Sequence, residues 1–274
     1  NFDGRIIVSV MTASITADFL AKSIFGLSPV FHYTNLQTIP LKYFGLIIIL
    51  GVILGVCGSI YNKVMVYSQH IYAKLNKPES EYKILIPTVF AFILAFTLPD
   101  VLAGGNQMVK ILENNQYILS TLITLLIVKF IFSAICFGSG APGGIFFPLL
   151  VLGSFIGAIF AVVCTNLIGI SADFTQKFII LAMAGFFCAT VRAPFTGIIL
   201  ITEMTGSLSH MISISLVCII SYVVAYIFKS EPIYESLLDN ILKKQKIELK
   251  EPSNETMLIT YNIAFESEVD GRRL

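Results

Sequence analysis

A glycine-rich break at residues 138–148, GSGAPGGIFFP, separates two apolar runs that are each long enough to cross a bilayer. The runs cover residues 117–137 and 149–168, and about 20 apolar residues span the roughly 30 Å hydrocarbon core. Irregular backbone at that depth is tolerated only where protein buries it or where it lines a water-filled cavity. A helix that restarts there directs unpaired N–H groups and the positive end of its dipole at the occupant of the cavity. An anion is the natural occupant of such a site.

The composition is that of an integral membrane protein. Of the 274 residues, 56% are hydrophobic and 13% are charged, and the mean hydropathy is +0.84, whereas soluble domains carry about 25% charged residues. The formal net charge of +1 argues against nucleic acid as a partner. Lysines cluster at residues 63–83 and 243–250, which places both regions, and the C-terminus, in the cytoplasm by the positive-inside rule.

The apolar pattern mixes full membrane spans with pieces that are too short to cross. Full spans are expected at residues 44–65, 117–137, 147–168 and 210–228, with a marginal one at 6–25 that Asp18 and Lys22 interrupt. Shorter apolar pieces are expected at residues 84–98, 178–190 and 195–204, a polar helix at 107–115, and an amphipathic surface helix at 232–246. This mixture predicts an all-α polytopic transporter or channel with discontinuous helices.

The two ends of the chain differ in character from its middle. The chain enters an apolar segment almost at once, which suggests a fragment that begins partway through a longer protein. After a linker at residues 252–254, residues 256–263 have β-like composition. We therefore expect a membrane domain over residues 1–246, and a linker with the start of a truncated cytoplasmic domain over residues 247–274.

The residue types of the break suit an anion site built from backbone. Glycines let the chain turn sharply and let a ligand approach without obstruction by Cβ atoms, while Ile145 and Phe146 fall in the first turn of the next helix and offer N–H groups. The alternative is a plain helix–helix turn in which the glycines serve only packing. The supporting loop of the candidate site consists of Gly138, Ser139, Gly140, Pro142, Gly143 and Pro148, and its candidate anion-binding residues begin at Gly144.

Four polar side chains near the membrane are further candidates. Placing the charge of Lys129 or Arg192 in a membrane costs free energy, so each is a functional candidate by default. Each could instead cap a helix end or extend to the membrane interface. Glu203 is a candidate proton-linked group or a structural acceptor. Tyr234 is an interfacial anchor, or an anion donor if its helix turns inward.

Other kinds of site find little support in the sequence. GxGxxG at residues 138–143 lacks the preceding short strand and the following acidic residue of a dinucleotide site. The five cysteines include no C-x-x-C pair, and the three histidines are scattered, so we expect no metal site. Without paired acids or a Ser/His pair, an enzyme is the weakest interpretation, and no cofactor is expected.

At this point the chain resembles a known family, the CLC chloride channels and chloride/proton antiporters. Residues 136–148 resemble the second-half anion-binding motif of the family, residues 192–205 its Arg-Ala-Pro-x-Thr-Gly segment, and residues 231–234 the stretch with its pore tyrosine. The resemblance covers residues 4–246. It implies a CLC-type inverted-repeat fold of which only the second repeat, with the last helix of the first, is present. It also implies that Ile145 and Phe146 amides and the Tyr234 hydroxyl hold a chloride ion.

The resemblance leaves the mode of transport open. The family's gating glutamate and proton-path glutamate would lie outside this chain, so a chloride/proton antiporter, a chloride channel and a fluoride-type carrier all stay possible. Chloride is the expected ion, with protons as a second partner in the antiporter. We expect a multi-pass protein of a bacterial plasma membrane, a homodimer, and a TrkA-type C-terminal domain. A nonfunctional partial chain or a structural or regulatory membrane subunit is the interpretation from another class.

Overall fold

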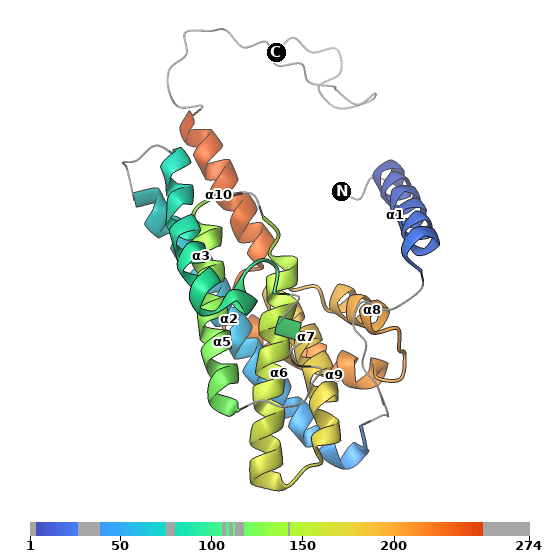
Figure 1. The fold of residues 1–274 in the computed structure, drawn as a ribbon. Coiled ribbons are helices and arrows are strands. Elements are labelled where there is room, and N and C mark those ends of the chain that lie inside the picture. The colour runs from blue at the N-terminus through green and yellow to red at the C-terminus, as the bar shows by residue number, and fades with distance from the viewer. Residues whose placement is uncertain are drawn as a thin grey trace. The chain divides into compact units, whose positions relative to one another are not determined.

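A computed structural model describes residues 4–26, 39–74, 80–105, 108–109, 112, 118–141 and 143–248 of the protein (Figure 1). Among these residues every regular element is helical, as the apolar pattern predicts. Residues 1–236 form one compact unit and residues 237–274 a second. The expected linker and strand at residues 252–263 lie outside the described residues, as does Pro142 of the glycine-rich break.

The helices reproduce the predicted mixture of long and short apolar segments. They run Gly4–Phe25 (α1), Phe44–Lys74 (α2), Leu85–Thr97 (α3), Leu119–Gly138 (α5), Phe146–Ile168 (α6), Thr175–Val191 (α7), Pro194–Thr205 (α8), Met211–Ile227 (α9) and Ile233–Glu248 (α10). Four segments are long and apolar enough to cross a membrane, namely α1, α2 with the 3-10 turn before it, α5 and α6. Helices α3, α7, α8 and α9 are apolar but shorter.

Two of these lengths differ from the sequence-based expectation. Helix α9 has 17 residues, so the run at residues 210–228 is shorter as a helix than a full span. Helix α7 also has 17 residues. It begins at Thr175, three positions before the start of the expected segment 178–190. The expected polar helix at 107–115 lies mostly outside the described residues, of which 108, 109 and 112 are helical.

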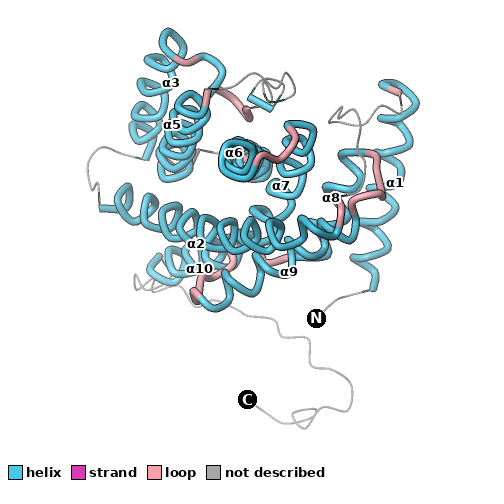
Figure 2. Tube along the Cα trace, turned by 90° about the horizontal axis from the view of Figure 1, so that it is seen from below, coloured by secondary structure: helices cyan, strands magenta, loops and turns pink. Residues whose placement is uncertain are grey.

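Helix α7 lies at the centre of the packing. Every residue from Lys177 to Thr190 is buried, and α7 contacts α2, α6, α8 and α9. Figure 2 shows α6 beside α7, with α2 and α9 running together along one side of them. A helix that is apolar all round is a core helix, which explains why the shorter α7, rather than a full span, fills the middle.

Glycines allow the closest helix pairs. A Cβ atom added at Gly157 would lie 2.6 Å from the Phe178 carbonyl oxygen of α7. One added at Gly55 would lie 2.6 Å from the Val224 side chain of α9. Both small-residue motifs, G-x-x-x-G at 51–55 and at 153–157, therefore serve packing within the chain.

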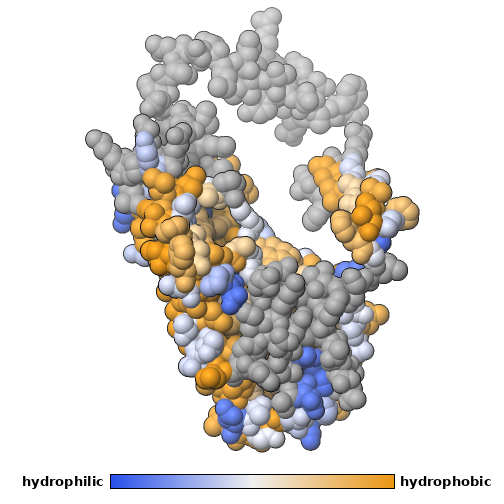
Figure 3. Space-filling view, in the orientation of Figure 1, coloured by the Kyte–Doolittle hydropathy of each residue, from blue (hydrophilic) through white to orange (hydrophobic). Residues whose placement is uncertain are grey.

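A continuous hydrophobic surface covers α3 and the outer face of α5 (Figure 3). On α5, Ile123, Ile127 and Ile131 recur every four residues and are all exposed, so they form one stripe along the helix. Such an area on a soluble protein would indicate a contact surface. Helix α5 is long and apolar enough to cross a membrane, and on such a helix an exposed apolar stripe is a face that lipid or another helix can cover.

Candidate functional site

The break between α5 and α6 is a turn that is fixed by hydrogen bonds of the Ser139 side chain and by the backbone conformation of Gly140. The Ser139 hydroxyl donates to the Cys136 carbonyl at 2.7 Å and accepts from the Ala141 N–H at 3.3 Å. Gly140 has φ +77°, a left-handed conformation that favours glycine. The chain thus leaves α5 and reverses within a few residues, which brings the start of α6 back toward α5.

The remaining glycines of the break divide into two kinds. A Cβ atom at Gly138 would lie 2.7 Å from the Tyr72 ring, so this glycine is required by packing. At Gly143 and Gly144 a Cβ atom would meet nothing within 4 Å among the described residues, and both are exposed. Packing among the described residues therefore does not account for the second pair, and the backbone there is open to its surroundings.

Helix α6 begins without a side-chain cap. Its N-cap residue, Ile145, makes no side-chain capping hydrogen bond, and the first N–H groups of a helix have no acceptor within the helix. Ile145 is buried and Phe146 half-buried, with the Phe146 ring set edge-to-face against Phe187, 5.9 Å between centroids. The start of α6 thus presents polar backbone between apolar side chains, at the positive end of the helix dipole.

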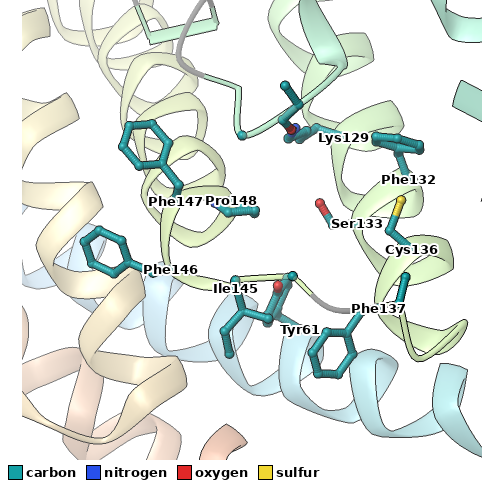
Figure 4. A pocket seen from close by; sticks show the side chains of 15 residues that line it. Tyr61, Lys129, Phe132, Ser133, Cys136, Phe137, Ile145, Phe146, Phe147 and Pro148 are labelled. Atoms are coloured by element: carbon teal, nitrogen blue, oxygen red, sulfur yellow. The ribbon is translucent and has the colours of Figure 1, made fainter.

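The glycines and the start of α6 face a cavity of about 510 Å³. Figure 4 shows Lys129, Ser133 and Cys136 on the α5 side of it, and Ile145 at the start of α6. The lining residues that matter below are Tyr61, Lys129, Gly143, Gly144, Ile145 and Phe146. Among the described lining residues none carries a carboxylate, one carries a positive charge, and most of the others are apolar.

Lys129 is that cation, and it is almost completely buried, with 1% of its surface exposed. Its ammonium donates to the carbonyls of Val101 at 2.7 Å and Ala103 at 2.8 Å. Among the described residues no carboxylate lies within ion-pair distance of it. Carbonyl dipoles alone compensate this charge within the described part of the chain, so Lys129 makes the potential of the neighbouring cavity more positive.

The other two charged candidates lie away from the cavity lining. Arg192 has φ +64° and ends α7, while its guanidinium donates to the carbonyls of Ala225 and Ser230, the latter at 2.6 Å. It thereby caps the C-terminus of α9 and holds the segment after it. The Glu203 side chain is 73% exposed, with Oε1 3.5 Å from the Lys22 ammonium of α1.

Tyr234 stands in the first turn of α10 and is 49% exposed. It does not line the cavity directly. The segment before it is held by Asn62 of α2, whose side-chain amide donates to the carbonyls of Thr190 and Glu231, each at 2.9 Å. Asn62 and Arg192 together therefore position the start of α10, and with it Tyr234.

Sequence reasoning missed two residues of this arrangement, Tyr61 and Asn62. Both belong to the apolar run at residues 44–65, where a tyrosine is ordinarily a packing residue. The available signal was the polar pair itself, since a tyrosine and an asparagine side by side interrupt an otherwise apolar span. Tyr61 lines the cavity, and Asn62 holds the segment before Tyr234.

Comparisons with known sequences agree with this architecture. A family profile described as voltage gated chloride channel matches residues 1–226. The H(+)/Cl(-) exchange transporter ClcA of Vibrio campbellii is 31% identical over 251 residues, covering 90% of this chain and 54% of that protein. ClcA of Yersinia pestis is 29% identical over 246 residues, covering 88% of this chain and 51% of that protein. The chain thus spans about half the length of these relatives.

Comparisons with solved structures give the same fold. The crystal structure of a slow cyanobacterial Cl⁻/H⁺ antiporter matches with a TM-score of 0.78 at 31% identity, over 85% of this chain and 55% of that one. A CLC-type fluoride/proton antiporter matches with a TM-score of 0.65 at 21% identity, over 82% of this chain and 53% of that one; this second likeness concerns the fold alone. With discontinuous helices that follow the CLC-type second repeat, the chain belongs to the CLC family of voltage gated chloride channels and transporters.

Proposed function

We propose that this chain is the second repeat of a transporter that exchanges chloride for protons across a bacterial plasma membrane. The observation that carries the proposal is the start of α6, where Ile145 provides no side-chain cap and Gly143 and Gly144 leave the backbone open to the cavity. The relatives named above as H⁺/Cl⁻ exchangers support the exchange reaction. On the family resemblance, we expect a homodimer with its C-terminus in the cytoplasm.

The proposed mechanism replaces water around chloride with protein donors. The N–H groups of Ile145 and Phe146 and the hydroxyl of Tyr234 take over part of the hydration shell of the ion. Each is a dipole of modest strength, so the ion is held without being trapped. Lys129, bound to carbonyls beside the cavity, adds a positive potential without contacting the ion. A cation in direct contact would slow the release of chloride.

Three considerations bear on the mode of transport. The names of the relatives favour an exchanger over a channel. A tyrosine at position 234 favours chloride over fluoride, on the family resemblance. On the family resemblance, the glutamates that would couple proton movement belong to the first repeat of the family fold. A partial chain without transport activity is the second candidate, favoured by the coverage of only about half of each relative.

The test is to replace Tyr234 in the full-length protein that includes the first repeat. We expect Tyr234→Phe to weaken chloride binding about tenfold in isothermal titration calorimetry, since a hydrogen bond to a charged group is worth about 1.5–3 kcal/mol. Tyr67→Phe, an exposed tyrosine on α2, is the matched control and should leave the affinity unchanged. Unchanged affinity and unchanged transport in Tyr234→Phe would contradict the assignment.

A further inference from the structure

The Tyr61 hydroxyl is a buried polar group whose use the fold does not explain. The side chain is 1% exposed, and its hydroxyl oxygen finds no hydrogen-bond partner among the described residues. Leaving such a group unpaired costs about 1–3 kcal/mol, and buried hydroxyls in native proteins are ordinarily bonded. The missing partner is therefore something outside the described residues.

Packing fixes the direction in which this hydroxyl points. The Tyr61 ring lies edge-to-face between Phe130 of α5, 5.7 Å between centroids, and Phe186 of α7, 5.6 Å between centroids. Held between these rings, the side chain rises from α2 toward the glycine-rich break, with its oxygen beside Ile145 (Figure 4). Tyr61 and Ile145 line the same cavity, so the unpaired hydroxyl is directed at the start of α6.

The chemistry of the surroundings selects the kind of partner. The described residues that line the cavity together with Tyr61 include Gly144, Ile145 at the uncapped start of α6, and Lys129, and none of the described lining residues carries a carboxylate. N–H groups and a hydroxyl can donate to one small anion, and the positive potential from Lys129 favours an anion over a cation in this cavity.

We propose that Tyr61 is a further anion-binding residue, whose hydroxyl donates to the chloride held by the start of α6. The inference rests on the proposed function, which assigns the anion to this helix start. It adds a donor from α2 to those from α6 and α10. Such an ion would give the Tyr61 hydroxyl the hydrogen-bond partner that the described residues do not provide.

The test is Tyr61→Phe in the full-length protein, measured by thermal unfolding with and without chloride and by calorimetry. Phenylalanine keeps the ring contacts and removes only the unpaired oxygen. Without chloride, we expect the unfolding temperature to stay unchanged or rise, since no protein hydrogen bond is lost. With chloride, the stabilisation by the ion should shrink, and the Kd for chloride should rise about tenfold. Tyr72→Phe, which removes the hydroxyl of another buried tyrosine of α2 outside the cavity lining, should change neither.

Other outcomes overturn the inference. A Tyr61→Phe protein that fails to fold, or that loses equal stability with and without chloride, would show that the hydroxyl bonds to protein. An unchanged Kd would show that it contributes nothing to the ion. If Tyr234→Phe weakens chloride binding and Tyr61→Phe does not, the inference fails and the proposed function stands. If the unsubstituted protein binds no chloride, both fail.

Discussion

At the scale of single residues, the glycines of the break are not interchangeable. Gly138 accommodates the Tyr72 ring, and Gly140 supplies a left-handed backbone. Gly143 and Gly144 do neither, because a side chain there would meet only empty space among the described residues. Substitutions at these positions therefore separate folding from ion binding.

We expect Gly144→Val to fold and to bind chloride poorly. The backbone at this position lies outside the left-handed region and has room for a Cβ atom, so the unfolding temperature should change little. The branched side chain would occupy the approach of the ion, and the affinity in calorimetry should fall at least about tenfold, or about 1.4 kcal/mol.

Gly138→Val is the contrasting variant for this prediction. Its Cβ atom would lie 2.7 Å from the Tyr72 ring, so it should lower the unfolding temperature in chloride-free buffer as well. Chloride binding by Gly144→Val that equals that of the unsubstituted protein would show that the space beside Gly144 has no part in the site.

Local patterns predicted the start of α6 correctly, but not its surroundings. Glycines followed by an apolar run gave the helix start at Ile145 and Phe146 because turn and helix signals lie next to one another in the sequence. For Tyr61 the sequence offered only the polar Tyr61–Asn62 pair in an apolar span, since its hydroxyl is distinctive only once α5 and α7 have closed on its ring. The Asn62 bond to the Thr190 carbonyl joins residues 128 positions apart, which no local pattern reports. The roles of Ile145, Phe146 and Tyr234 in holding an ion stay predictions.

At the scale of helices, close approach between α6 and α7 holds the start of α6 in place. Gly153 and Gly157 bring α6 against the α7 backbone, so that a Cβ atom at either would lie under 3 Å from it. Helix association in membranes depends on such packing, because lipid offers no hydrophobic driving force. The full length of α6, not only its first turn, therefore determines where the N–H groups of Ile145 and Phe146 point.

Gly157→Val tests this packing directly. We expect it to destabilise the protein by about 1–3 kcal/mol, the usual cost of overpacking, because the Cβ atom would lie 2.6 Å from a backbone carbonyl that cannot move alone. Thermal unfolding in detergent measures the effect. Gly45→Ala, in α2 where a Cβ atom meets nothing within 4 Å, is the matched control and should be neutral or slightly stabilising. Equal unfolding temperatures for Gly157→Val and Gly45→Ala would contradict the prediction.

At the scale of the whole molecule, the chain supplies one side of the proposed site. In transporters built from inverted repeats, the substrate binds at the interface between the repeats, and this chain covers about half of each relative. We therefore expect liposomes that contain only the 274-residue chain to show no chloride flux above empty liposomes. The full-length protein in matched liposomes is the positive control. Flux through the 274-residue chain alone would show that one repeat suffices, against the proposal.

The hydrogen bond from Asn62 to the segment before α10 also has a consequence for the order in which the chain folds. The Asn62 amide joins α2 to the Glu231 carbonyl 169 positions later, so during synthesis α2 is complete long before this partner exists. Closing a loop of this length costs chain entropy, and the contact cannot form before residue 231 has been synthesised. The segment that carries Tyr234 can therefore join α2 only after every helix from α2 to α9 has been made.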